Sequence, residues 1–494
     1  MIETGWVSIL PPLIAIILAL VTKEVYSSLF IGLMSGMIIY TVAAHEPLVA
    51  VFAHTFDMMA EKMADNSYMI IFLALLWAVI TLVGRSGGMK AYGRWAEKRL
   101  HSRTMTKVAT AILGVLIFID DGFNCLTIGT IMRPIYDRQK ISREKLAYII
   151  DATAAPVCII APVSSWAVAV ASEVSDTNGF YAFLSTIPYN LYAILTLVMV
   201  AFVCFSGRDF GKMKKAEDDA LATAGASDET GDETDEIKGR VIDLVLPIIV
   251  LIICAILGMA YVGGYFSGVP FSEAIGYNPT AGLSLGAFAG LVTAFFMYIP
   301  RKIMKPKEFV SGIVNGIGSI IPPMIILILS WSLGGVCRQM IGTGEFISGF
   351  VASSNISLTL LPLLVFVIAS LMSFSMGTSW GTFGILIPIV SMICQASGGE
   401  MLIPALGATL AGSVYGDHCS PISDTTILSS TGAMCDHIRH VETQIPYATL
   451  VAAVCAIGYL VIGSSGSAIA GIITGIVILI GAMIFMTRGT KKEG

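Results

Sequence analysis

Apolar runs long enough to cross a bilayer alternate with short polar segments along most of the chain. An α-helix rises about 1.5 Å per residue, so about 20 apolar residues span the hydrocarbon core. The pattern shows no sign of the ten-residue alternation that is typical of an outer-membrane barrel. It therefore predicts an all-α polytopic membrane protein with about 11 transmembrane helices, at residues 7–21, 28–43, 68–84, 147–171, 182–205, 241–262, 280–299, 321–337, 401–424, 446–464 and 466–486.

Two further apolar stretches, 108–132 and 358–394, fit poorly as simple crossings. Clusters of Lys and Arg flank 108–132 on both sides, so the positive-inside rule places both of its ends in the cytoplasm. The flanks of 358–394 have almost no Lys or Arg, which favours entry from the outside. We expect two re-entrant hairpins, with their tips at F-I-D-D-G-F-N (118–124) and F-S-M-G-T-S-W-G-T (374–382).

This arrangement places the N-terminus outside and the C-terminus in the cytoplasm. All but two of the 29 Lys and Arg residues, Lys62 and Arg338, then lie on the cytoplasmic face. The first apolar run lacks a basic segment before it and a small-residue cleavage site after it, so we expect a retained helix and no cleaved signal. Nothing in the sequence suggests an organelle, and we expect the cytoplasmic membrane of a bacterium.

The two halves of the chain match each other weakly but in order. Trp77 aligns with Trp331, Phe118 with Phe374, and A-P-V-S-S (161–165) with S-P-I-S-D (420–424). Each half has a hairpin and then a Pro-interrupted helix, and the hairpins enter from opposite sides. Inverted repeats with broken helices are typical of secondary transporters, which bind substrate near the midplane; a gated channel is the alternative.

The repeats divide the chain into an N-terminal helix pair (1–45), repeat 1 (46–205), a linker (206–240), a connecting helix pair (241–300), repeat 2 (301–464), and a last helix with a tail (465–494). The charged stretch from Arg208 to Arg240 has almost no large apolar residues, so we expect a disordered cytoplasmic linker. The stretches 46–65 and 305–318 resemble interfacial amphipathic helices.

Composition narrows the classes of function. Hydrophobic residues make up 55% of the 494 residues and charged residues 13%, which excludes an ordinary soluble protein. The formal net charge of −5 argues against nucleic acid as a partner. The nine cysteines lie singly in apolar segments, and no nucleophile–base–orienter set or cofactor motif is evident, so we expect neither a disulfide framework nor an enzyme.

The first hairpin tip has the first candidate ligands for a cation. An ionisable residue at membrane depth needs a partner or a function. Asp120, Asp121 and Asn124 offer oxygen atoms beside a turn that Gly122 permits. The alternative is that the aspartates only cap a helix or face cytoplasmic water.

The broken helix of the first half adds Asp151 and an unwound stretch. Asp151 either faces the site or forms an ion pair with Lys145 or Arg143. Pro156 and Pro162 free backbone carbonyls that suit a cation. Ser164, Ser165 and Trp166 are candidate substrate ligands, with packing as the alternative for Trp166.

The second half has the denser block G-D-H-C-S-P-I-S-D-T-T (416–426). Asp417 and Asp424 flank Pro421, with His418 beside the first. A carboxylate that binds either Na⁺ or H⁺ couples the two by competition. His418 is either a titrating group or a satisfied core histidine. Hydroxyl and tryptophan side chains from this block and the second hairpin tip are candidate substrate ligands: Ser375, Thr378, Ser379, Trp380, Ser420, Ser423 and Thr425.

Further along, Asp436, His437, Arg439 and His440 are predicted to lie in a solvated cytoplasmic turn, with a pH-sensing role as the alternative.

The 416–426 block, the downstream T-Q-I-P-Y-A (443–448) and F-I-D-D-G-F-N resemble the NhaC family of sodium/proton antiporters. This resemblance covers nearly the whole chain. It implies the ion-transporter superfamily, whose carriers have inverted repeats with paired hairpins, move by an elevator mechanism and tend to form homodimers. The family also includes members similar to malate/lactate exchangers and members linked to amino-acid uptake.

We therefore expect a secondary transporter that exchanges Na⁺ for H⁺, with no cofactor beyond these transported ions. The alternative is Na⁺- or H⁺-coupled transport of an amino acid or small organic acid. The expected Na⁺ ligands are Asp120, Asp121, Asn124, Thr378 and Asp424.

Overall fold

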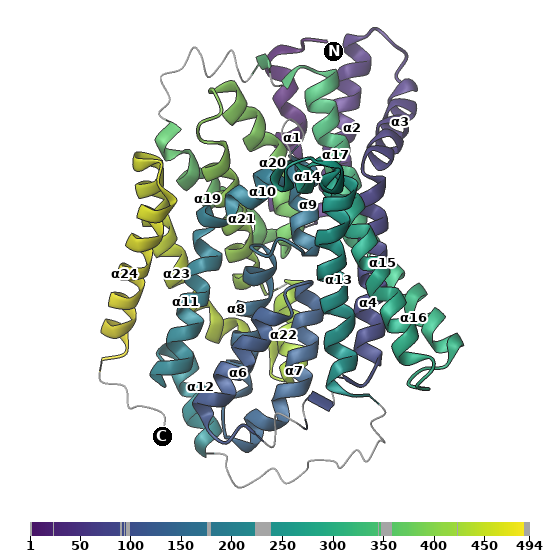
Figure 1. Ribbon diagram of the computed structural model, residues 1–494. Coiled ribbons are helices and arrows are strands. Elements are labelled where there is room, and N and C mark those ends of the chain that lie inside the picture. The colour runs from purple at the N-terminus through teal and green to yellow at the C-terminus, as the bar shows by residue number, and fades with distance from the viewer. Residues whose placement is uncertain are drawn as a thin grey trace.

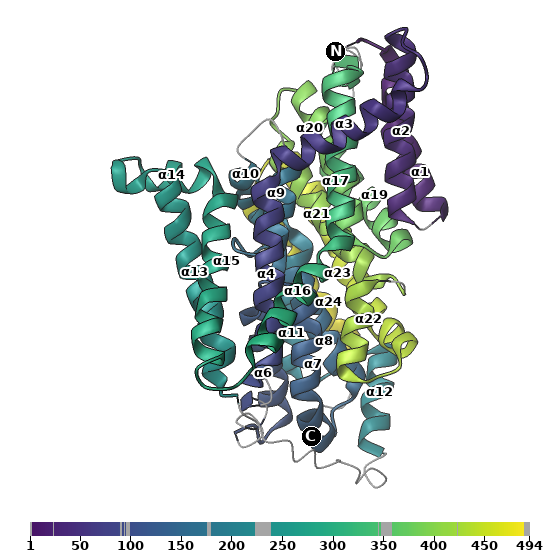
Figure 2. The same cartoon turned by 90° about the vertical axis from the view of Figure 1, so that its right-hand side faces the viewer.

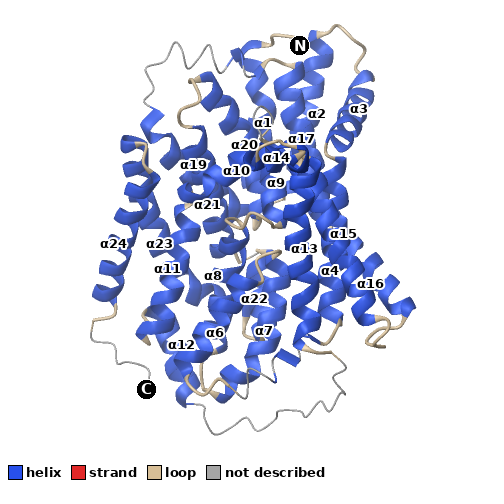
Figure 3. Ribbon diagram, in the orientation of Figure 1, coloured by secondary structure: helices blue, strands red, loops and turns tan. Residues whose placement is uncertain are grey.

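The computed structural model describes residues 2–22, 24–88, 91–92, 94, 99–174, 179–222, 239–343, 345–346, 358–421 and 423–488. Throughout these ranges the regular secondary structure is helical and there is no strand, which confirms the predicted all-α class (Figure 3). The chain begins at one end of the molecule, and its last helix, α24 (Ala468–Met486), ends at the other (Figure 1).

Ten helical segments in the described ranges are long and apolar enough to cross a membrane. Several of them expose large aliphatic side chains, as α24 does with Ile469, Ile473 and Val477. Apolar side chains that face outward on a long helix indicate contact with lipid. The chain is therefore a multi-pass membrane protein.

The predicted crossings of the first half correspond to α1 (Leu10–Thr22), α2 (Val25–Ala43) and α4 (Ser67–Arg85). In the middle of the chain they correspond to α13 (Val241–Val262), α15 (Pro279–Tyr298) and α17 (Ile321–Gly335). α13 and α15 pack together, with the short α14 (Phe271–Tyr277) projecting at one end, and α15 also packs on α4 (Figure 2).

Both stretches predicted as amphipathic helices are helical. α3 (Ala50–Asp65) runs obliquely to α4, and α16 (Pro306–Ser319) packs along α4 (Figure 2). Gly312 and Gly316 allow the close approach of α16, because a Cβ at Gly316 would lie 2.5 Å from the carbonyl oxygen of Trp77.

The two predicted hairpins are present, in opposite halves of the molecule (Figure 1). The first consists of α6 (Arg103–Leu116) and α7 (Asp121–Arg138), and the second of α19 (Leu361–Met376) and α20 (Ser379–Ala396). Gly377, at φ 67°, has the left-handed conformation that ends α19. The opposite placement of the hairpins is the one that inverted repeats require.

The two predicted helix breaks are also present. The crossing at 147–171 consists of α8 (Arg143–Cys158) and α9 (Ser165–Glu173), which are separated around Pro162. The crossing at 401–424 consists of α21 (Leu402–Cys419) and α22 (Asp424–Ala433), which are separated around Pro421. Pro156 does not break its helix and lies inside α8.

The broken helices connect the two repeats. α8 packs on the first hairpin and α21 on the second, so each first arm stays with its own repeat. The second arms exchange partners, since α22 packs on α7 and α9 packs on α20. α7 and α22 approach so closely that a Cβ at Gly129 would lie 2.5 Å from the carbonyl carbon of Gly432.

Two predictions of chain organisation were wrong. The segment 182–205 is not one helix but α10 (Gly179–Thr186), a short 3₁₀ turn and α11 (Leu191–Ser206), because Pro188 interrupts it. The first part of the predicted disordered linker is α12 (Gly211–Ala222), which packs on α8 and α23 (His437–Ser465). The rest of that linker, 223–238, lies outside the described residues.

Buried charge explains why α12 is folded. Glu217 is buried and pairs with Arg103 and Lys145. It also accepts hydrogen bonds from the backbone N–H and the hydroxyl of Ser142. A segment with little apolar surface is thus held by ionic and polar contacts, which a compositional argument does not detect.

Candidate functional site

The two hairpin tips and the interruptions of the two broken helices are four helix breaks, and hydroxyl groups join them in pairs. The backbone N–H of Ser165 donates to the carbonyl oxygen of Ile119 at 3.1 Å, and its Oγ donates to the same oxygen at 3.3 Å. In the second repeat, Ser379 Oγ donates to Asp417 Oδ2 at 3.0 Å and contacts the carbonyl oxygen of Ser413 at 3.1 Å. Each hairpin tip is therefore fixed to the broken helix of its own repeat.

A helix begins at each break, and its first turn is capped by a side chain. Asp120 accepts from the N–H of Phe123 at 2.9 Å to cap α7. The other three caps are hydroxyls of Ser164 on α9, Thr378 on α20 and Ser423 on α22. Four helix N-termini thus lie at the breaks, and each presents the positive end of a helix dipole.

Carboxylates from both repeats lie at these breaks. Asp424 interacts electrostatically with Asp120, Asp121 and Asp417. Asp120 and Asp417 are buried, Asp121 is half-buried and Asp424 is exposed. None of the four forms an ion pair with a Lys, Arg or His of the described residues, whose ion pairs lie elsewhere.

The predicted alternative for Asp120, a helix cap, is confirmed, because its Oδ1 accepts a hydrogen bond from the N–H of Phe123. This cap does not neutralise the carboxylate. Asp121 lies in the first turn of α7, where its Oδ1 accepts from the N–H of Gly122 at 3.0 Å.

Asp151 lies in a separate polar cluster, which joins α8, α22 and α23. Its Oδ2 accepts from Gln444 Nε2 at 2.6 Å and from Thr426 Oγ1 at 3.2 Å. His440 Nε2 lies 3.4 Å from Oδ2, and His418 Nε2 lies 3.9 Å from Oδ1. Asp151 is completely buried.

The predicted alternative for Asp151, an ion pair with Lys145 or Arg143, is wrong. Lys145 pairs with Asp209 and Glu217, and Arg143 pairs with Asp137 at 2.9 Å. Lys145 precedes Asp151 by six residues, about 240° around a helix, so the two side chains leave α8 on different faces.

His418 contacts both Tyr192 and the polar cluster around Asp151. Its Nδ1 lies 3.2 Å from the hydroxyl of Tyr192, and its carbonyl oxygen accepts from Gln444 Nε2 at 2.8 Å. Its Nε2 is buried without a hydrogen bond and faces Asp151. His418 is therefore placed beside a carboxylate rather than enclosed by core side chains alone.

His440 is not in a solvated turn as predicted. It is completely buried in the first turns of α23, where its Nε2 lies 3.0 Å from Ser429 Oγ. Gln444, on the same helix, binds Asp151 and was not predicted. The one-turn spacing of His440 and Gln444, which places them on one helix face, was the signal available in the sequence.

Asn124 holds the first hairpin together. Its Nδ2 donates to the carbonyl oxygens of Gly114 at 2.7 Å and Ile117 at 3.0 Å, which are unpaired at the end of α6. The Oδ1 atom is buried without a hydrogen bond, so its lone pairs are available to a cation.

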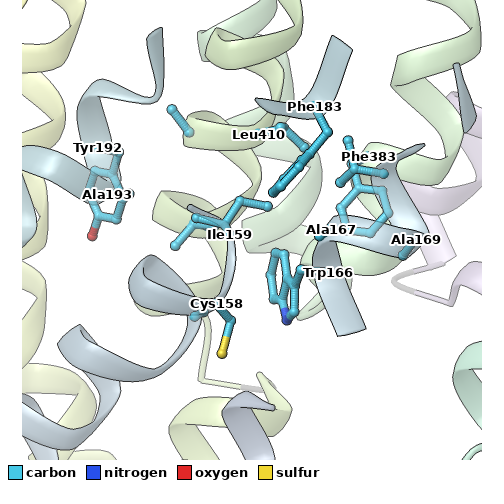
Figure 4. Close-up of a cluster of buried hydrophobic side chains, with 14 of the residues drawn as sticks. Cys158, Ile159, Trp166, Ala167, Ala169, Phe183, Tyr192, Ala193, Phe383 and Leu410 are labelled. Carbon is cyan, nitrogen blue, oxygen red and sulfur yellow. The ribbon is translucent and has the colours of Figure 1, made fainter. Parts of the chain in front are cut away.

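Three aromatic rings pack beside the breaks. The ring of Trp166 is completely buried and lies 6.0 Å from the ring of Trp380 and 5.8 Å from that of Phe383. Figure 4 shows Trp166 and Phe383 together with Phe183 and Leu410. Trp166 packs, as expected, whereas Trp380 is partly exposed.

The remaining predicted residues lie at the breaks with differing exposure. Ser420 and Ser423 are buried at the two ends of the α21–α22 break, and Thr425 Oγ1 lies 3.1 Å from Ser423 Oγ. Thr378 and Ser375 are half-buried near the second hairpin tip. In the described ranges no three His, Cys, Asp or Glu side chains are grouped as a metal site, so three carboxylates do not converge on one point.

Comparisons with known proteins agree with this architecture. The model of the Na⁺/H⁺ antiporter family matches residues 167–464. An uncharacterized protein of Haemophilus influenzae is 39% identical over 488 residues, 94% of this chain and 92% of that protein. A malate-2H⁺/Na⁺-lactate antiporter of Bacillus subtilis is 33% identical over 206 residues, which cover 36% of this chain and 42% of that antiporter.

The YdaH transporter of Alcanivorax borkumensis has a similar structure, with a TM-score of 0.53. The likeness covers 87% of this chain and 89% of the transporter at 13% sequence identity, so it concerns the fold alone.

Proposed function

The chain belongs to the Na⁺/H⁺ antiporter family, and from this premise we propose that it exchanges cytoplasmic Na⁺ for external H⁺ across the cytoplasmic membrane. Membership makes it a secondary transporter embedded in a lipid bilayer. The identity of the exchanged ions and the orientation, with the N-terminus outside, belong to the proposal.

The observation that carries the proposal is the set of carboxylates at the helix breaks. Asp120, Asp121, Asp417 and Asp424 interact electrostatically, yet none has a basic partner in the described chain. Carboxylates at membrane depth require a neutralising charge. A cation or a proton supplies that charge, and binding of one reduces the affinity for the other.

The oxygen atoms around these carboxylates suit a hard monovalent cation. We assign Asp424 as the main carboxylate ligand of Na⁺. The hydroxyl oxygen of Thr378 and the amide Oδ1 of Asn124, which has no hydrogen bond, are assigned as neutral ligands. Since three acidic side chains do not converge, neutral oxygens complete the coordination shell.

A second candidate cargo is a small organic acid. Two observations favour it: the half-exposed Trp380 borders the buried ring of Trp166, and helix N-termini next to these rings attract a carboxylate. The partial match to a malate/lactate antiporter supports the same class.

Purified protein in liposomes tests the exchange. We expect an imposed pH gradient, acidic on the side that corresponds to the outside of the cell, to drive Na⁺ in the direction opposite to the proton flow. Asp424→Asn is expected to reduce the rate of this exchange at least tenfold. Asp218→Asn, at an exposed carboxylate on α12, is the matched control and retains the wild-type rate. Full activity of Asp424→Asn, or the absence of Na⁺-dependent proton flux in the wild type, refutes the proposal.

The pH dependence adds a quantitative criterion. If one proton competes with Na⁺ for the same carboxylates, the apparent KM for Na⁺ rises as the pH falls, by about tenfold per pH unit at the acidic limit. The organic-acid alternative is distinguished by Na⁺-dependent thermal stabilisation that increases further with malate, lactate or an amino acid.

A further inference from the structure

The carboxyl group of Glu173 is buried at the end of α9 that lies away from the helix breaks. α9 begins at Ser165, beside the first hairpin tip, and ends eight residues later at Glu173. At 1.5 Å per residue this separates Glu173 from Ser165 by about 12 Å along the helix. The residue is only 1% exposed, and neither Oε1 nor Oε2 has a hydrogen bond.

The hydroxyl of Ser330, which lies beside Glu173, donates its hydrogen to another acceptor. Pro388 in α20 has no N–H, so the carbonyl oxygen of Gly384 loses its partner within that helix. Ser330 Oγ of α17 donates to this oxygen at 2.5 Å. Ser330 also faces Glu173, and both side chains lie close to Gly384, where a Cβ would be 3.2 Å from Ser330 Oγ and 3.8 Å from Glu173 Oε1.

One basic group lies near Glu173. Arg338 interacts electrostatically with it, and lies in the π-helical turn Val336–Met340 that follows α17. π-helical turns in otherwise regular helices occur frequently at functional sites. Arg338 Nη1 is itself buried without a hydrogen bond, so the two side chains are not joined by a direct ion pair.

On the helices that pack on α9, no other charged group faces Glu173. Helices α10, α17 and α20, which pack on α9, have no Asp, Glu, Lys, Arg or His. α4 has only Arg85, at its far end. The charged residues of α8, Arg143, Glu144, Lys145 and Asp151, lie toward the opposite end of the molecule and have the partners described above or, for Glu144, Arg439.

These contacts fit a carboxylic acid better than a carboxylate. An ionised Glu173 would have two charged oxygens with no donor, which is strongly unfavourable in a buried site. A protonated Glu173 can instead donate its O–H to the lone pair of Ser330 Oγ. Ser172 fixes the neighbouring turn, because it accepts from Trp331 Nε1 at 3.1 Å.

We propose that Glu173 is a second proton-binding residue of this transporter, placed between the carboxylates at the helix breaks and the end of the molecule where the chain begins. This inference rests on the proposed Na⁺/H⁺ exchange. When water enters between α17 and α20, the O–H bond of Glu173 breaks and the proton passes to a water molecule. The guanidinium of Arg338 then offsets the charge of the remaining carboxylate.

Two transport modes separate proton coupling from Na⁺ binding. We expect Glu173→Gln to reduce pH-driven Na⁺ uptake into liposomes at least tenfold relative to Na⁺/Na⁺ exchange, which needs no net proton movement. Glu173→Asp restores part of the coupling. Glu61→Gln, whose side chain is 54% exposed on α3, is the matched control. An equal loss of both modes, or no change in either, overturns the proposal.

An infrared measurement keeps this test separate from the identity of the cargo. Difference spectra of the purified protein between acid and alkaline pH are expected to contain a carboxylic-acid C=O component that Glu173→Gln removes and Asp424→Asn leaves. If the wild type exchanges no Na⁺ for H⁺ but this component is present, the proposed function fails and the proton site stands. If Glu173→Gln leaves the spectrum unchanged, the proton site is refuted.

Discussion

Replacing Lys145 with methionine tests whether the charged cluster that binds α12 stabilises the protein. The ammonium group of Lys145 is completely buried, forms an ion pair with Asp209 and lies 3.5 Å from Glu217. Arg103 also pairs with Glu217, and the hydroxyl of Tyr447 donates to Asp209 at 3.0 Å. Lys145→Met therefore removes the ammonium group from Asp209 and Glu217 together, while Arg103 still pairs with Glu217.

The expected loss follows from the burial of this pair. Removal of one partner of a buried ion pair costs about 3–5 kcal/mol of unfolding free energy. An unfolding entropy of about 2.1 cal/mol/K per residue gives about 1 kcal/mol per kelvin for 494 residues. The midpoint of thermal unfolding is thus expected to fall by at least about 3–5 °C, and by more where membrane helices persist and the unfolding entropy is smaller.

Tryptophan fluorescence during heating of the detergent-purified protein measures this midpoint. The double variant Lys145→Met/Asp209→Asn is the decisive comparison, because it removes both charges and keeps groups of similar size. It is expected to recover most of the loss, since neutral replacement of a buried ion pair is often nearly neutral. An unchanged midpoint for Lys145→Met, or a double variant no more stable than the single one, refutes the reasoning.

Two further predictions concern the packing of the repeats and the site. Gly129→Ala is expected to reduce the free energy of unfolding by about 1–3 kcal/mol, because its Cβ would lie 2.5 Å from the backbone of Gly432. The loss is measured as a lower midpoint of thermal unfolding. Gly481→Ala, with open space around it, is the neutral control, and equal midpoints for both variants contradict this account. Asp417→Asn is expected to raise the KM for Na⁺ at least tenfold in the liposome uptake assay. Ser379→Ala removes one hydrogen bond to that carboxylate and is expected to raise the KM by a smaller factor. The reverse order would show that the hydroxyl matters more than the charge.

The helix breaks were predictable because their causes are local. Pro162 and Pro421 each interrupt an apolar run, and Gly377 permits the left-handed turn that ends α19. The inverted arrangement followed from the position of Lys and Arg, since their placement in membrane proteins depends on the side of the membrane.

Partners from distant segments were not predictable in this way. Asp151 binds Gln444, which is 293 residues further along the chain, and no periodicity relates the two positions. α12 has too few apolar residues to indicate folding, and is held by ion pairs to α6 and α8. Glu173 is the last residue of α9, where sequence alone does not distinguish a buried end from an exposed one.

The exchange of packing partners by α9 and α22 restricts the movements that could open the site first to one side of the membrane and then to the other. Because α22 packs on the first hairpin and α9 on the second, separating the two hairpins would break both contacts at once. The intermeshed helices instead favour displacement of both hairpins, with their carboxylates and caps, as a single rigid unit. Access would then alternate by changing what surrounds the site, while the ligands of the ion keep their mutual geometry.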